Sequence, residues 1–218
     1  MPVFALDQSL SFPPAHFAEP DGLLALGGDL STDRILTAYK QGIFPWYEGP
    51  VILWWSPDPR FVLFPEKLNV SKSMKQLLRR DAFDFRMNTC FSEVIRNCRI
   101  SERKDQDGTW IDDDIQQAYT RLHEIGYALS AECFLNNQLV GGLYGVRIGK
   151  IFYGESMFTK VSNASKYAFI KLVEQLKKEG IVLIDCQVYT DHLQSLGAEM
   201  IPREQFIELL KQYAREGV

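Results

Sequence analysis

The feature that most constrains this chain is a strand–helix–strand unit near residues 150–188. Lys150–Phe158 reads as a strand, 163–179 as a helix that ends at Gly180, and Ile181–Val188 as a second strand. At this spacing the two strands are expected to lie parallel in one sheet, joined by a crossover helix. Their carboxyl ends then open at the same edge of the sheet, which is where ligands bind in such units.

Three polar side chains interrupt these otherwise apolar strands. Glu155 lies in the first strand, and Asp185 and Gln187 lie two residues apart in the second, so these two share a face and Cys186 points away. A carboxylate here can accept a proton or orient an amine, and an amide can hold the amine or donate to an oxyanion. A buried network that only fixes the sheet is the alternative. Three such residues at one strand mouth favour chemistry on a cationic or amine-bearing substrate.

The rest of the chain predicts an α+β protein. Helices are expected at 31–40, 71–80, 91–98, 112–125 and 203–215, and strands at 83–87, 127–134 and 138–146, with Asn136 and Asn137 forming a hairpin turn. Prolines at 45, 50, 57, 59 and 65 exclude a long helix from the aromatic region in which they lie. We expect a small, loop-rich N-terminal domain (residues 1–62) and a C-terminal domain (63–218) with a mixed sheet flanked by helices.

Charge is distributed unevenly along the chain. The net charge is −4, but residues 60–104 carry eleven basic and five acidic side chains. A basic stretch on an acidic protein is typical of a local phosphate-binding face. A pair of solvated helix faces would have the same composition, and charge alone does not separate the two interpretations.

Composition and spacing exclude several classes of protein. The chain is 46% hydrophobic and 24% charged, as in globular proteins, and no apolar run reaches the ~20 residues of a membrane span. The four cysteines form no C-x-x-C pair and the three histidines are not spaced as ligands, so a zinc site is not expected. The N-terminus lacks the basic region of a secretory signal. We expect a cytoplasmic, monomeric protein with reduced thiols.

Several long motifs, taken together and in order, resemble the bacterial leucyl/phenylalanyl-tRNA–protein transferase family. They run from about residue 19 to residue 206 and include E-P-D-G-L-L-A-L-G-G-D-L-S (19–31), A-Y-K-Q-G-I-F-P-W (38–46), L-W-W-S-P-D-P-R (53–60), G-T-W-I (108–111), L-V-G-G-L-Y-G-V (139–146), G-E-S-M-F (154–158), N-A-S-K (163–166) and L-I-D-C-Q-V (183–188). The resemblance implies a C-terminal domain similar to the acetyltransferase (GNAT) fold. It also implies transfer of Leu or Phe, and of Met, from aminoacyl-tRNA to the α-amine of proteins that begin with Arg or Lys, which marks them for degradation. No metal or organic cofactor is expected on the same ground.

The same resemblance assigns roles to individual residues. Asp185 and Gln187 act on the acceptor amine, with Asp185 either as the base or as the group that orients Gln187, and Glu155 contacts the terminal adenosine or the acceptor. The other assigned residues are Tyr39, Trp46, Trp110, Ser156 and Met157 for the substrates, and Lys72, Lys75, Arg79 and Arg80, within the basic segment 60–104, for the tRNA acceptor stem.

Two other functions use the same features. An acyl-CoA N-acyltransferase would share the fold, but the chain after Glu155 lacks the Q/R-x-x-G-x-G/A loop that holds pyrophosphate in those enzymes. A non-catalytic module that binds tRNA or peptide would not need Glu155, Asp185 and Gln187 together. We therefore favour the aminoacyl transferase over both.

Overall fold

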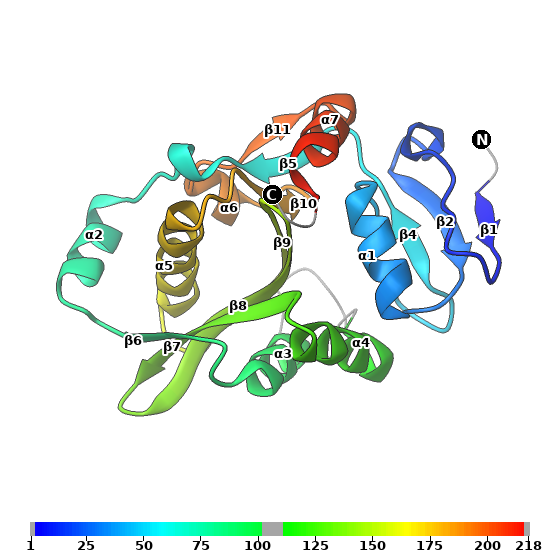
Figure 1. Cartoon of the computed structure of the whole chain (residues 1–218). Coiled ribbons are helices and arrows are strands. Elements are labelled where there is room, and N and C mark those ends of the chain that lie inside the picture. Colours follow the sequence, from blue (N-terminus) through cyan, green and yellow to red (C-terminus); the bar gives the residue numbers. More distant parts are fainter. Residues whose placement is uncertain (1–2, 102–110, 216–218) are drawn as a thin grey trace.

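Two sheets organise the chain, whose computed structural model describes residues 3–101 and 111–215 (Figure 1). The first sheet has the order β1-β2-β4-β3, and the second has the order β11-β5-β10-β9-β8-β7-β6. Within the second sheet β10 runs parallel to β9, while the other neighbours are antiparallel. The strands are β1 (Phe4–Leu6), β2 (Leu23–Gly27), β3 (Phe44–Pro45), β4 (Leu53–Trp55), β5 (Arg60–Leu63), β6 (Asp84–Met87), β7 (Ala128–Leu135), β8 (Gln138–Ile148), β9 (Ile151–Thr159), β10 (Leu183–Gln187) and β11 (Glu199–Ile201).

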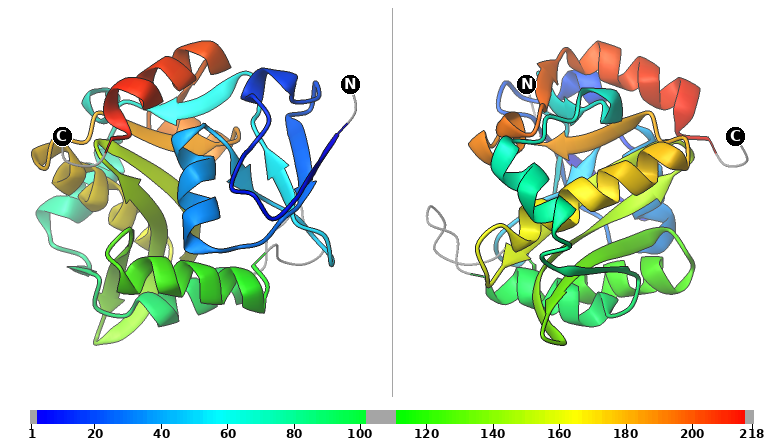
Figure 2. Two further views of the ribbon diagram at one scale, coloured as in Figure 1. Left: turned by 45° about the vertical axis from the view of Figure 1, so that its right-hand side comes forward. Right: turned by 90° about the vertical axis from the view of Figure 1, so that its left-hand side faces the viewer.

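The helices cover both faces of the second sheet (Figure 2). They are α1 (Thr32–Lys40), α2 (Lys72–Arg79), α3 (Phe91–Ile100), α4 (Asp113–Glu124), α5 (Ala164–Lys178), α6 (Asp191–Ser195) and α7 (Arg203–Tyr213), with short 3-10 turns η1 (Ala15–Phe17) and η2 (Pro65–Lys67). Helix α5 packs on one face of the sheet, and α3 with α4 packs on the other. Helix α1 lies between the two sheets, where Tyr39 packs on Tyr153 with ring centroids 4.7 Å apart. In the described part of the chain, no helix has the length and apolar character that a bilayer crossing requires.

The predicted strand–helix–strand unit is confirmed as β9, α5 and β10, with Asp185 in register with Tyr153. The hairpin turn is also as expected, because Asn136 and Asn137 both have positive φ, at 50° and 61°. Ser31 caps α1, as predicted, by accepting a hydrogen bond from the backbone N–H of Arg34. The α+β architecture with its mixed sheet and flanking helices is therefore confirmed.

Several short elements were not expected, namely the strands of the first sheet, β5, α6 and β11. Each has two to five residues, which is too short for a clear hydrophobic period. The change from one sheet to the other occurs between Trp55 and Arg60, because β5 pairs with β10 and β11. The predicted domain boundary at residue 62 thus falls inside β5, and the predicted loop at 104–108 lies outside the described residues.

The alternation of side chains along the second sheet separates two hydrophobic cores. Val62 and Tyr153 face the core that is shared with α1, α3 and α4, whereas Phe61 and Phe152 face the core beneath α5. Cys186 belongs to the α5 core, on the face opposite Asp185, as predicted. The polar groups of β9 and β10 therefore meet between the second sheet and the N-terminal part of the chain.

Candidate active site

Glu155 is positioned by a bulge in β9. Ser156 and Gly154 pair with consecutive residues of β8, so Glu155 between them has no partner there. A bulge re-aims the side chain that it contains, and bulges are common next to active sites. Gly145 on β8 makes this bulge possible, because a Cβ atom there would lie 2.2 Å from the carbonyl oxygen of Tyr153.

A second bulge lies at Cys186 in β10, where Asp185 and Gln187 pair with consecutive residues of β5. Gln187 has a φ of 63°, in the left-handed region that residues other than glycine rarely adopt. Its backbone N–H donates to Oδ1 of Asp185 at 2.9 Å, which stabilises this conformation. Its side-chain Nε2 donates to Oε1 of Glu155, also at 2.9 Å. The two bulges thus bring all three predicted residues into one hydrogen-bonded group.

Asp185 forms a buried ion pair with Arg60. Nε of Arg60 donates to Oδ1 at 2.8 Å and its Nη2 donates to Oδ2 at 2.7 Å, while Nη1 donates to the carbonyl oxygen of Gly42 at 3.2 Å. The guanidinium carbon lies 4.7 Å from the ring centroids of both Phe44 and Phe206. Arg60 is 1% exposed and Asp185 is fully buried. The predicted basic surface at 60–104 therefore does not include Arg60, because its guanidinium group is buried in an ion pair with Asp185.

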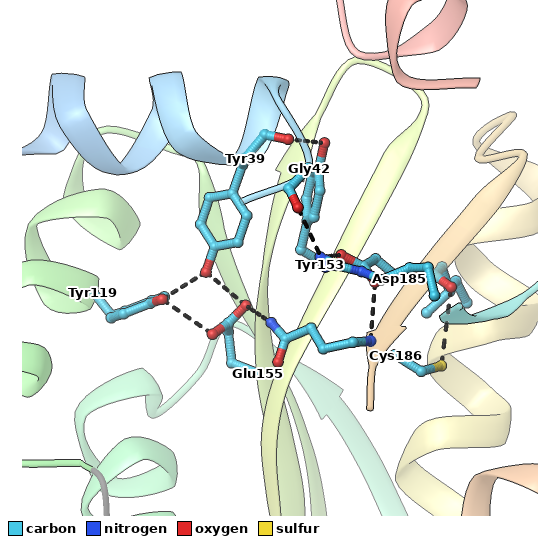
Figure 3. A network of polar contacts seen from close by, with 10 residues as sticks. Tyr39, Gly42, Tyr119, Tyr153, Glu155, Asp185 and Cys186 are labelled. Atoms are coloured by element: carbon cyan, nitrogen blue, oxygen red, sulfur yellow. Dashed lines mark hydrogen bonds and ion pairs between the residues drawn. The ribbon is translucent and has the colours of Figure 1, made fainter. Parts of the chain in front are cut away.

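Two tyrosine hydroxyls surround the carboxyl group of Glu155 (Figure 3). The hydroxyl oxygen of Tyr39, from α1, lies 2.7 Å from Oε1, and that of Tyr119, from α4, lies 3.0 Å from Oε2, both at hydrogen-bond distance. The two hydroxyl oxygens also lie 2.5 Å from each other. The hydroxyl of Tyr153 donates to the backbone oxygen of Tyr39 at 3.1 Å, which fixes the end of α1 against the sheet. Tyr39 is fully buried, so its hydroxyl contacts Glu155 and does not reach the surface.

The surroundings change the acidity of this group. Loss of hydration is the main cause that raises the pKa of Glu155 to about 7; the charge of Asp185 acts in the same direction, and the hydrogen bonds to Tyr39, Tyr119 and Gln187 oppose both. Loss of hydration also raises the pKa values of Tyr39 and Tyr119 well above 10, and the charge of Glu155 adds to this. Both tyrosines are therefore neutral at pH 7, and Glu155 changes its charge in the physiological range.

A cavity of about 330 Å³ opens where β9 and β10 stop pairing. Glu155 and Gln187 line one side of it, and the remaining wall is mostly apolar. The predicted residues Ser156 and Met157 both lie in this wall, which also includes Leu143, Phe169, Ile184, Cys186, His192 and Leu193. A larger cavity of about 840 Å³ lies between η1, the end of α1 and α7, but the polar group described above does not line it. The smaller cavity is thus the one that the polar group serves.

The other predicted site residues are spread more widely. Trp46 is half-buried beside the first sheet, with its ring centroid 5.8 Å from that of Trp55. The basic residues of α2, namely Lys72, Lys75, Arg79 and Arg80, are all exposed. Trp110 lies outside the described residues. The structure thus joins Tyr39 to the polar group and places the α2 cations on a separate surface.

The sequence interpretation missed Tyr119 and misassigned Arg60. Tyr119 follows Ile115 and precedes Leu122 on the apolar face of α4, and a hydroxyl on a buried face needs a polar partner. Arg60 begins the apolar strand β5, whose four residues are all buried. A buried arginine in such a strand requires an acidic partner, and Asp185 in the apolar strand β10 likewise requires a basic one. These two charged residues in apolar strands were the signal in the sequence that could have predicted the ion pair.

Known proteins resemble this chain along nearly its whole length. Residues 62–211 match the family described as leucyl/phenylalanyl-tRNA protein transferase, and residues 28–58 match the N-terminal domain of that family. A leucyl/phenylalanyl-tRNA–protein transferase from Syntrophobacter fumaroxidans is 53% identical, over 100% of this chain and 94% of that protein. One from Nitrosospira multiformis is 54% identical, over 92% of this chain and 88% of that protein.

Solved structures are related more distantly. A GNAT-family acetyltransferase from Staphylococcus aureus is 18% identical, over 45% of this chain and 69% of that chain, with a TM-score of 0.35. The structure of L-PGS from Bacillus licheniformis is 11% identical, over 86% of this chain and 65% of that chain, with a TM-score of 0.41. These scores are too low to carry a functional comparison, whereas the sequence matches cover both parts of the chain. The chain therefore belongs to the leucyl/phenylalanyl-tRNA protein transferase family.

Proposed function

We propose that this protein transfers Leu, Phe or Met from aminoacyl-tRNA to the N-terminal α-amine of an acceptor protein. The observation that carries the proposal is the contact between Gln187 and Glu155 at the rim of an apolar cavity. The names of the family and of its relatives point to the same reaction. The aminoacyl ester of the donor is already activated, so the enzyme needs to position an amine against it and can dispense with a nucleophile of its own.

The cavity between β9 and β10 is the site for the aminoacyl side chain. At about 330 Å³ it lies at the lower end of the range for small-molecule pockets. Met157, Phe169 and Ile184 give it an apolar wall, which suits the side chains of Leu, Phe and Met and disfavours charged ones. The ester group then lies at the rim, beside Glu155 and Gln187.

Gln187 is the group that meets the reacting atoms. Its bond to Glu155 uses one amide hydrogen, so its second hydrogen and its carbonyl oxygen can bind the substrates. The α-amine attacks the ester carbonyl carbon, the C–N bond forms and the C–O bond breaks. One amine proton passes to the leaving hydroxyl oxygen at the 3′ end of the tRNA.

The resemblance implied that Asp185 is either the base or the group that orients Gln187, and we propose the second role. Both of its oxygens already accept hydrogen bonds from Arg60, and Oδ1 also accepts the backbone N–H of Gln187. Both oxygens are thus already engaged with donors that the fold holds in place, which leaves neither well placed to take the proton of an amine. Asp185 therefore holds Gln187 in place and leaves the proton of the amine to other groups.

The finer features of the partners follow the family resemblance. We propose that acceptors begin with Arg or Lys, that the enzyme works as a monomer, and that it acts in the cytoplasm, where charged tRNA is abundant. The exposed cations of α2 are the proposed contacts to the phosphates of the acceptor stem. Peptides that begin with Arg, Lys, Asp and Glu, offered in one competition assay, separate basic from acidic acceptors.

The first prediction concerns Gln187. The change Gln187→Met keeps the length of the side chain and removes its polar atoms, so the amine and the ester lose their positioning group. We expect leucine transfer from Leu-tRNA to a peptide that begins with Arg to fall by about 100-fold or more in kcat/KM. The control Gln175→Met, at a half-buried position on α5, should transfer leucine within about twofold of the wild-type rate. Full transfer by the Gln187→Met protein would remove Gln187 from the reaction, and absence of transfer by the wild type would overturn the proposed function.

The second prediction concerns the size of the cavity. Leu193 from α6 lines it and is only partly buried, so Leu193→Phe should fill space without unfolding the protein. We expect the ratio of Leu to Phe transfer to rise by about tenfold, since a mismatch of this size in an apolar pocket costs about 1–3 kcal/mol. Competition between Leu-tRNA and Phe-tRNA measures the ratio, with the volume-conserving Leu193→Met as control. An unchanged ratio would place the aminoacyl side chain elsewhere.

The third prediction concerns α2. Phosphate contacts release counterions, so the double change Lys72→Ala and Lys75→Ala should weaken tRNA binding and reduce the slope of log K against log salt by about 2. The slope is measured by titrating labelled tRNA at several salt concentrations. Lys211→Ala, on α7, provides a matched control for the loss of surface charge. If the slope of the double variant equals that of the wild type, the acceptor stem lies on another face.

A further inference from the structure

Three oxygen contacts close a ring around Glu155. Tyr39 lies 2.7 Å from Oε1, Tyr119 lies 3.0 Å from Oε2, and the two hydroxyl oxygens lie 2.5 Å apart. All three distances are short enough for hydrogen bonds. The hydroxyls come from α1 and α4, and the carboxyl group comes from the bulge in β9 (Figure 3). Three separate parts of the chain thus converge on one closed set of oxygens.

The number of hydrogens in this ring depends on the charge of Glu155. Each tyrosine hydroxyl carries one hydrogen and an ionised carboxylate carries none. With an ionised carboxylate, two hydrogens must serve three contacts. If both hydroxyls donate to the carboxylate, the 2.5 Å contact between Tyr39 and Tyr119 has no hydrogen, and if Tyr119 donates to Tyr39 instead, its 3.0 Å contact with Oε2 has none. If Oε2 carries a hydrogen, it donates to Tyr119, Tyr119 donates to Tyr39, and Tyr39 donates to Oε1. Every contact then has one hydrogen, and Oε1 still accepts the bond from Gln187.

We propose that Glu155 carries this third hydrogen in the free enzyme, so that the acceptor binds as a neutral and nucleophilic amine. The inference rests on the aminoacyl transfer proposed above, and it concerns how that same site selects the reactive form of its acceptor. Tyr119 is thereby a positioning residue, because its hydroxyl closes the ring that keeps the hydrogen on Glu155.

The charged and titratable groups around Glu155 are consistent with a neutral site. The charge of Asp185 on β10 acts on Glu155, and it is balanced by Arg60 from β5 at 2.7 Å. His192 from α6 lines the same cavity, and burial, with the charge of Lys166, lowers its pKa from 6.5, so it is neutral at pH 7. Tyr39 and Tyr119 are neutral as well, since their pKa values are well above 10. Protonation of Glu155 therefore leaves the group without net charge.

A neutral site has a direct chemical consequence. An α-ammonium group has no lone pair and cannot attack an ester, and an ionised carboxylate beside it would stabilise that unreactive form. Without this charge, the ammonium gives one proton to the solvent as the acceptor binds. The resulting amine forms the C–N bond, the ester C–O bond breaks, and a second amine proton passes to the leaving oxygen. Glu155 keeps its hydrogen throughout.

Proton release on acceptor binding tests the proposal. A peptide that begins with Arg is titrated into the enzyme without tRNA, by calorimetry in two buffers of different ionisation enthalpy. At about pH 6.5 the free α-amine is mostly protonated, so we expect release of about one proton per peptide. The same release should occur in Glu155→Gln, whose amide imitates the protonated carboxyl group and has no proton to give up.

The variant separates the two possible sources of the proton. Release in the wild type that disappears in Glu155→Gln would mean that Glu155 ionises and binds an ammonium ion, which would overturn the proposal. No release in either protein would overturn it as well. Leucine transfer to the same peptide, measured alongside, tests the proposed function separately, because transfer by the wild type can persist while either of these results removes the inference.

Infrared spectroscopy of the free enzyme tests the ring directly. With labelled glutamate, we expect at pH 6 a carbonyl band of a protonated carboxyl group that is absent from Glu155→Gln. Tyr119→Phe opens the ring and should shift this band. Tyr153→Phe removes a nearby hydroxyl that donates to the backbone oxygen of Tyr39, and it should leave the band in place. A carboxylate band alone in the wild type, or a band that Tyr119→Phe does not move, would contradict the assignment.

Discussion

The buried ion pair between Arg60 and Asp185 is the interaction on which the rest of the site depends. A charge that leaves water without a partner costs several kcal/mol, so neither residue can hold its place alone. The guanidinium group also lies between the rings of Phe44 and Phe206 and bonds to the backbone of Gly42. One side chain thereby ties the turn after α1, the strands β5 and β10, and α7 together. The relative position of the N-terminal sheet and the second sheet is fixed at the floor of the site.

The ion pair also supports the irregular backbone above it. Gln187 has a left-handed conformation that costs free energy, and Asp185 accepts its backbone N–H while bound to Arg60. The bulge in β9 turns Glu155 toward Gln187. The hydroxyls of Tyr39 from α1 and Tyr119 from α4 contact its carboxyl group there. The sheet therefore stops pairing where its polar groups gather, which opens the cavity that we propose for the aminoacyl side chain, beside the groups that we propose act on the amine.

Signals between neighbouring residues were enough to predict most helices, strands and turns. The arrangement of the candidate site depends on contacts between residues that are far apart in the sequence. The strand–helix–strand unit, the Asn136-Asn137 turn and the Ser31 cap depend on neighbouring residues, so they could be read directly. Arg60 and Asp185 are 125 residues apart in the sequence. Counting charges along the chain gives no information on burial, so Arg60 was assigned to a basic surface. Tyr119 was missed for a related reason, since its role depends on the hydroxyl of Tyr39 and the bulge at Glu155. The strands of the first sheet were too short to show a period.

A double-mutant cycle on the ion pair tests the central claim most directly. Removing one partner, by Arg60→Met or Asp185→Leu, strands a buried charge and should cost about 3–5 kcal/mol of unfolding free energy, whereas the double variant should recover most of that stability. The account predicts that the double variant folds but still transfers leucine at least about 100-fold more slowly than the wild type, because Gln187 has lost the acceptor that holds its backbone. A stable double variant with wild-type transfer would show that the ion pair only holds the fold together and does not position Gln187.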